Sequence, residues 1–139
     1  MKWRDHLPNE CPPDDAIPTN GVVYRLASRK NFDETDFLSY REMYPDGHWD
    51  GVPECIACGL SVFTEIAGIE RLLRRVPGKK RSKSHKVKKV IEGKLTPKHG
   101  KMKNTPSTTH KSHHTWWIPV GEEPWKVFRL IELPEDRTS

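Results

Sequence analysis

Three polar residues whose side chains could take part in chemistry interrupt apolar stretches of the sequence. They are Arg25, Ser61 and Glu132. Each alternates with apolar neighbours, as expected on a β-strand with one polar face. Arginine grips phosphate oxygens through its forked guanidinium, and a carboxylate can hold a ribose hydroxyl or stabilise a cationic sugar. Together the three residues indicate a site for a phosphate-bearing nucleotide; the alternative for Arg25 is an exposed place on an edge strand.

A second candidate site lies near the C-terminus, where three histidines in five residues precede two tryptophans. The residues are His110, His113, His114, Trp116 and Trp117. Histidine transfers protons near neutral pH, and tryptophan can stack on a base or on nicotinamide. If this stretch is a strand, His113 and His114 point to opposite faces, so one lines a site while the other faces away. The alternative is a surface strand anchored by buried tryptophans, with the histidines as polar filler.

The cysteines form one close pair, Cys55 and Cys58, and a distant third, Cys11. A C-x2-C pair can bind zinc together with two histidines. Here the residues between and after the pair are apolar, and the histidines are far along the chain, so the sequence favours buried thiols over metal ligands. An odd number of cysteines also argues against a disulfide framework.

Positive charge is concentrated in one part of this 139-residue chain, whose net charge is +5. Fourteen Lys or Arg and a single acid, Glu92, lie between Arg71 and Lys103. A local basic segment favours a polyanion partner, and the alternative is a solvated loop. For a nucleic-acid partner the expected contacts are Lys79, Lys80, Arg81 and Lys83, with Trp116 stacking on a base.

Hydrophobicity patterns predict a single α+β domain. We expect an extended arm over residues 1–20, the domain over 21–133 with a basic segment at 77–112, and a tail at 134–139. Strands are expected at 22–27, 60–63, 114–119 and 125–133, the last of them central, and the two main helices at 33–43 and from Ile66 to a stop at Pro77. They would form a small mixed or antiparallel sheet. Neither a membrane-length apolar run nor a signal-peptide core occurs, which predicts a cytoplasmic protein without membrane contact.

Three short stretches resemble the opening half of ADP-ribosyltransferase-like domains, in particular the RES-type toxin branch. They are VVYRLA, GHWDG and GLSVFTEIAGIERLL, all within residues 21–73. The resemblance implies an ADP-ribosyltransferase-like fold in which Arg25 and Ser61 hold NAD and Trp49 lies beside the cofactor. It also implies a glutamate, for which Glu42, Glu70 and Glu132 are candidates.

The expected function is therefore that of an NAD-using transferase or NAD-cleaving enzyme of toxin or defence type. Arg25 would bind the NAD phosphates, Ser61 would orient the ribose, and His113 or His114 would contact the nicotinamide or the acceptor. One alternative is a nucleic-acid-binding module without catalysis that uses residues 71–103, Trp116 and Trp117. A second alternative is a small zinc-binding domain.

Overall fold

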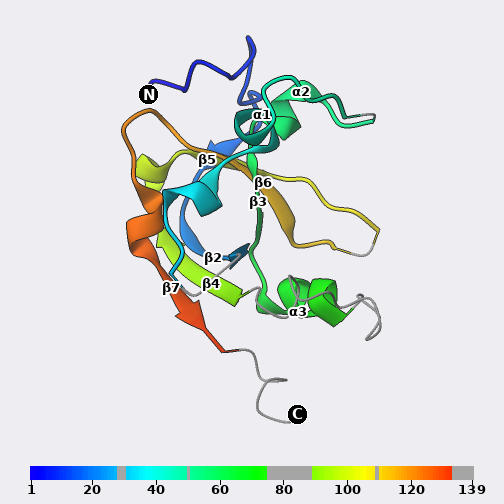
Figure 1. Cartoon of the computed structure of the whole chain (residues 1–139), viewed down its shortest axis with the longest axis vertical. Helices are drawn as coiled ribbons and strands as arrows, with labels where there is room; N and C mark the ends of the chain where they lie inside the picture. Colours follow the sequence, from blue (N-terminus) through cyan, green and yellow to red (C-terminus); the bar gives the residue numbers. More distant parts are fainter. Residues whose placement is uncertain (28–30, 50, 75–88, 109, 133–139) are drawn as a thin grey trace.

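The computed structural model describes residues 1–27, 31–49, 51–74, 89–108 and 110–132. Seven strands form one antiparallel sheet in the order β1-β5-β6-β3-β2-β4-β7 (Figure 1). The strands are β1 Ile17–Pro18, β2 Gly21–Ala27, β3 Leu60–Phe63, β4 Lys89–Leu95, β5 Lys101–Asn104, β6 His113–Trp117 and β7 Phe128–Ile131. The helices are α1 Tyr40–Met43, α2 Glu54–Ala57 and α3 Ile66–Arg74, with 3-10 turns η1 Glu34–Phe37, η3 Pro97–His99 and η4 Pro124–Val127. The predicted α+β class is confirmed, with an antiparallel sheet.

The main core covers one face of the sheet. Its largest members are Phe37, Trp116 and Phe128. The ring centroid of Phe37 lies 6.3 Å from that of Trp116 and 5.0 Å from that of Phe128. Buried aromatic side chains contribute large apolar areas, which compensates for a sequence that is only 34% hydrophobic. Phe37 reaches this core from η1, so the segment that contains η1 and α1 is fastened across the same face.

The opposite face carries two smaller clusters. At one end α3 packs through Ile69 against Phe63 and Val90, as the apolar face of the predicted helix implies. At the other end Trp117 packs against Cys11 and Ala16 of the N-terminal arm. In Figure 1 α3 lies at the bottom of the view, and α1 and α2 lie at the top.

Two predicted elements differ from the structure. The helix expected at 33–43 is divided into η1 and α1, because Asp33 and Ser39 each cap a new turn and Leu38 between them is extended. The last strand begins only at Phe128, after Pro124 opens a 3-10 turn, and it lies at the edge of the sheet rather than at its centre. None of the helices in the described part of the chain is both long and apolar enough to span a bilayer.

Candidate functional site

The strands β2 and β3 separate beside Arg25. They are paired only at Tyr24 and Phe63. Beyond that pair Arg25 lies in the opening, where Nη1 donates to the Ser61 carbonyl at 2.6 Å and Nη2 donates to the Asp36 carbonyl at 2.8 Å. The guanidinium lies 5.5 Å from the centre of the Phe37 ring. Arg25 therefore occupies an interior strand, and the alternative of an exposed edge strand is wrong.

The Arg25 guanidinium is a desolvated cation with hydrogen-bonding capacity left over. Removal from water lowers its pKa to about 10, against the Coulomb attraction of Asp36 and Tyr40, so the group remains charged at neutral pH. Within the described ranges no carboxylate forms an ion pair with it, and its buried Nε has no hydrogen-bond partner. A buried donor without an acceptor is unfavourable, and either a water or an anionic oxygen would satisfy it.

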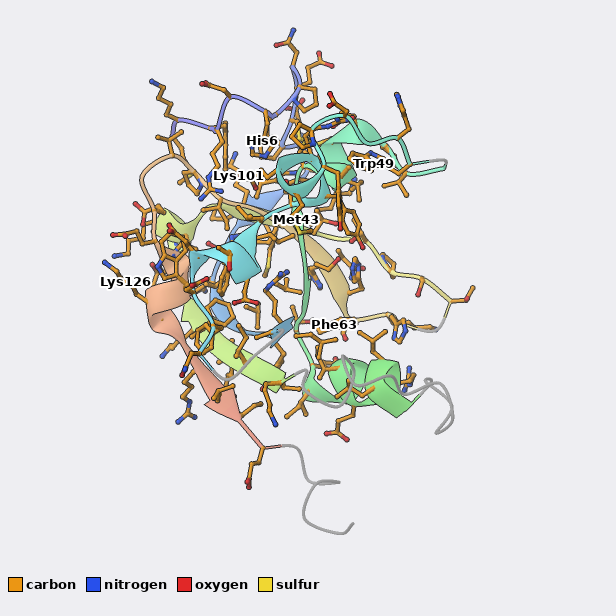
Figure 2. All side chains as sticks on the ribbon, in the orientation of Figure 1. His6, Met43, Trp49, Phe63, Lys101 and Lys126 are labelled. Atoms are coloured by element: carbon orange, nitrogen blue, oxygen red, sulfur yellow. A yellow bond between two sulfur atoms is a disulfide. The ribbon has the colours of Figure 1, made fainter. Side chains whose placement is uncertain are left out.

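A cavity of about 120 Å³ adjoins this guanidinium. Its lining residues are Arg25, Leu38, Ser39, Tyr40, Met43, Gly59, Leu60 and Ser61. The volume suits a phosphate-sized group, because sites for whole drug-sized ligands occupy several hundred cubic ångströms. Tyr40 and Met43 are exposed at its rim, and the Trp49 ring lies 6.2 Å from that of Tyr40. Figure 2 shows Met43 and Trp49 at the same end of the molecule, so a flat ring outside the cavity would meet an aromatic surface.

Ser61 and His113 form a hydrogen-bonded pair on the other face of the sheet. Serine Oγ lies 3.0 Å from His113 Nε2, and His113 Nδ1 lies 2.9 Å from the Thr105 carbonyl. The same Nδ1 also lies 2.9 Å from Thr105 Oγ1, a hydroxyl that can donate or accept. A proton on Nδ1 is the tautomer that satisfies the carbonyl, and in that tautomer Nε2 accepts from the serine hydroxyl. Burial lowers the pKa of His113, and the neighbouring His114 and His110 lower it further, against the hydrogen bond to Thr105. The imidazole is thus neutral at pH 7, as a general base must be.

Ser61 connects the two polar groups. In the register of β3 with β6, Ser61 is opposite Thr115 and Phe63 is opposite His113. The side chains of these four residues therefore lie on one face of the sheet. The Ser61 carbonyl instead lies at the edge of β3 that borders the opening toward Arg25. The N–H and C=O groups of one strand residue point to the same edge, so the Ser61 N–H borders that opening too. Arg25 therefore contacts the backbone of Ser61, and its guanidinium does not converge with the hydroxyl as the sequence suggested.

His114 lies on the other side of β6 from His113, as predicted for a strand. Its register partner is Val62 of the main core, and its Nδ1 lies 2.8 Å from the Ser112 carbonyl. The structure therefore brings His113 to Ser61 and keeps His114 apart from it.

The three candidate glutamates lie in different parts of the fold, and Glu42 is hydrogen-bonded to Ser39 at the cavity wall. Glu132 is exposed after β7, and both β2 and β4 separate that strand from β3. Glu42 Oε2 accepts from Arg4 Nη1 at 3.0 Å, and Glu42 Oε1 accepts from the backbone N–H of Ser39. Glu70 lies on α3. The assignment of Glu132 to the same site as Ser61 is wrong, because the last strand joins the sheet at its edge.

Trp116 is fully buried, which contradicts its predicted role in stacking on a base. Its ring lies 6.0 Å from that of Phe128, and its Nε1 donates to the His99 carbonyl at 2.9 Å. Exposing it would require the main core to open. The predicted nucleic-acid contacts Lys79, Lys80, Arg81 and Lys83 lie outside the described residues, so a nucleic-acid partner stays a prediction.

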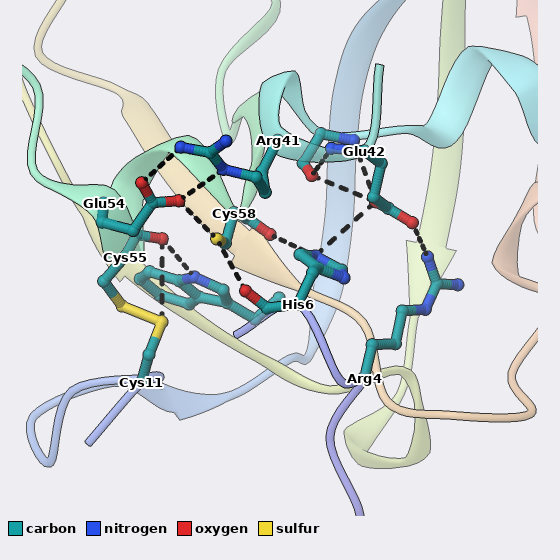
Figure 3. Close-up of polar contacts among 10 residues, drawn as sticks. Arg4, His6, Cys11, Arg41, Glu42, Glu54, Cys55 and Cys58 are labelled. Carbon is teal, nitrogen blue, oxygen red and sulfur yellow. Dashed lines mark hydrogen bonds and ion pairs between the residues drawn. A yellow bond between two sulfur atoms is a disulfide. The ribbon is translucent and has the colours of Figure 1, made fainter. Parts of the chain in front are cut away.

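The cysteines depart from the expected set of buried thiols. Cys11 and Cys55 form a disulfide that ties the N-terminal arm to α2, so Cys55 is not available as a zinc thiolate (Figure 3). No cluster of three or more His, Cys, Asp or Glu in the described ranges is placed to hold a metal ion. Disulfides are typical of oxidising compartments, so this bond argues against the predicted cytoplasmic location. The location itself stays a prediction.

Cys58 is the free, buried thiol that the sequence predicted. Its Sγ donates to Glu54 Oε2 at 3.2 Å. Burial raises its pKa to about 12, and the hydrogen bond to Glu54 adds to the shift. Figure 3 also shows Arg41 binding the same carboxylate through two nitrogens, at 2.7 and 2.9 Å. This network braces α1, which forms one wall of the cavity.

Sequence reasoning missed Thr105, which orients His113, and Tyr40 at the rim of the cavity. Thr105 follows β5 directly, and its Oγ1 lies 2.9 Å from Thr115 Oγ1. The only local signal was its place in a polar turn between two stretches that proved to be adjacent strands. No family model matches this sequence, and the comparisons with characterised proteins and with solved structures gave no match either.

Proposed function

We propose that the protein is an NAD-using enzyme that cleaves the nicotinamide–ribose bond or transfers ADP-ribose, as in the toxin or defence systems that the sequence resembles. The observation that carries the proposal is the half-buried Arg25 cation, whose buried Nε has no partner, one strand away from a serine hydroxyl hydrogen-bonded to a neutral histidine. The first group suits phosphate binding and the second suits proton transfer.

The size of the cavity supports one arrangement of such a ligand. One phosphate of the NAD pyrophosphate would enter the space beside Arg25 and Ser39, and an aromatic ring would lie over Tyr40 at the rim. The Ser61 hydroxyl is exposed on the other face of β3, so the nicotinamide ribose would reach it past the opening between β2 and β3. His113 would then accept the proton of the attacking water or acceptor.

NAD turnover and NAD binding test this proposal separately. Nicotinamide release and a thermal shift on adding NAD are both expected for the wild-type protein. Tyr40→Ala should weaken binding about tenfold, at the scale of one lost stacking contact, without unfolding the chain, because the side chain is exposed. His113→Gln should lower turnover about 10²-fold or more and leave the NAD-induced shift intact. A wild-type protein that neither binds nor consumes NAD would overturn the proposal.

A further inference from the structure

We propose that Ser61 is also a nucleophile toward carboxylic esters, with His113 as its general base. This activity goes beyond the proposed NAD chemistry, because it needs no nucleotide and it forms a covalent bond to the serine. The inference starts from the chain of contacts that runs from Ser61 Oγ through the His113 ring to the Thr105 carbonyl.

The three groups fulfil the roles that an activated serine requires. The Oγ–Nε2 separation of 3.0 Å is within hydrogen-bond reach for proton transfer, and the bond at Nδ1 fixes the tautomer that leaves Nε2 as the acceptor. Ser61 is exposed in the middle of an otherwise buried strand, so an electrophile can reach its hydroxyl. An ordinary surface serine has no neutral base held in this orientation.

The backbone N–H of Ser61 is the oxyanion donor that the strand itself supplies, because it borders the opening between β2 and β3. The Arg25 guanidinium, 2.6 Å from the Ser61 carbonyl in the same opening, adds positive charge beside that backbone without reaching the hydroxyl. Donors aimed at developing negative charge supply much of the catalysis in acyl transfer. The Ser61 hydroxyl is exposed rather than enclosed, so small, water-soluble esters with short acyl groups are the substrates to test first.

The reaction is balanced without any further reagent except water. Ser61 Oγ forms a bond to the ester carbonyl carbon while its proton passes to His113 Nε2. The bond from that carbon to the alcohol oxygen then breaks, and the leaving alkoxide takes the proton from Nε2. Water, deprotonated by the same nitrogen, attacks the acyl-serine and releases a carboxylic acid, which restores the Ser61 hydroxyl.

A fluorophosphonate probe and p-nitrophenyl acetate test the proposal on the full-length protein without NAD. We expect the probe to label Ser61, as located by peptide mass spectrometry, and Ser61→Ala to lose both the label and ester turnover. Ser107→Ala changes an exposed serine in a turn outside the site and should retain both. His113→Gln should slow labelling by about 10²-fold or more. Circular dichroism and the melting temperature establish that each variant is folded.

The outcomes separate the two proposals. Labelling of wild-type Ser61 with no NAD consumption would support the nucleophile and remove the NAD function. NAD consumption by a protein whose Ser61 is not labelled and which does not hydrolyse the ester would overturn the nucleophile alone. Equal labelling of wild-type protein and His113→Gln would also overturn it, because the serine would then be reacting without its base.

Discussion

Ser61 and Cys58 are both nucleophile-type side chains, and their surroundings alter their reactivity in opposite directions. Ser61 is exposed and bonded to a neutral imidazole that can accept its proton. Cys58 is buried and bonded to the Glu54 carboxylate, which disfavours a second negative charge. The thiol, which is the more acidic group in free solution, is thus kept from ionising, whereas the serine hydroxyl has a base beside it. Residue type alone therefore says little about which side chain reacts.

The largest expected difference in turnover is between two single variants, one at each of the histidines on opposite faces of β6. His113→Gln should lower turnover of ester, and of NAD if it is a substrate, by 10²- to 10⁴-fold through loss of the general base. His114→Gln should change it less than about threefold, since that ring lies on the opposite face with Val62. Steady-state kinetics of both variants measure the difference, and similar losses in the two would break the contrast.

Alkylation measures how far the raised pKa suppresses the reactivity of Cys58. With its pKa raised to about 12 from an ordinary value of 9.0, the thiolate population at pH 8 should be about 10³-fold lower than for a free thiol. Iodoacetamide should therefore label Cys58 slowly in the folded protein and rapidly after denaturation in urea without reductant. Rapid labelling of the native protein would mean that the thiol is not protected.

The disulfide joins the arm to α2 and packs beside Trp117, at the end of β6 opposite His113. Replacing Cys11 and Cys55 by serine should reduce the free energy of unfolding by about 2–4 kcal/mol, as expected for a cross-link between residues separated by 44 positions. Urea denaturation measures this loss. At urea concentrations below the lowered midpoint, Ser61 labelling by the fluorophosphonate should persist, because His113 lies at the other end of β6 from Trp117, where the arm packs. Loss of labelling in a folded variant would show that the arm shapes the site.

The smallest effect is expected at the ion pair between the arm and α1. Arg4→Ala removes a partly exposed contact of 3.0 Å to Glu42 and should destabilise the protein by less than about 1 kcal/mol. The change should diminish further in high salt, where exposed charges are screened. A loss above 2 kcal/mol in urea denaturation would mean that Arg4 contributes more to stability than a partly exposed ion pair does.

Local sequence patterns predicted the parts of the fold that depend on near neighbours. The β3–α3 unit, strand β2 and the opposite faces of His113 and His114 follow from alternation and helical spacing. Features that depend on distant segments were missed. The bond between Cys11 and Cys55 and the contact of Thr105 with His113 both require tertiary placement that no local pattern encodes. The edge position of β7 was missed for the same reason.

The protonation state of the His113 ring decides whether it can act as the base for Ser61. Side-chain nitrogen NMR at a series of pH values reports both the tautomer and the pKa of each imidazole ring. We predict a proton on Nδ1, an unprotonated Nε2 at pH 7 and a pKa below the ordinary 6.5, so that the base is available at neutral pH and is lost as the pH falls through that lowered value. A proton on Nε2 in the neutral ring, or a pKa above 6.5, would contradict the assignment of His113 as the base for Ser61.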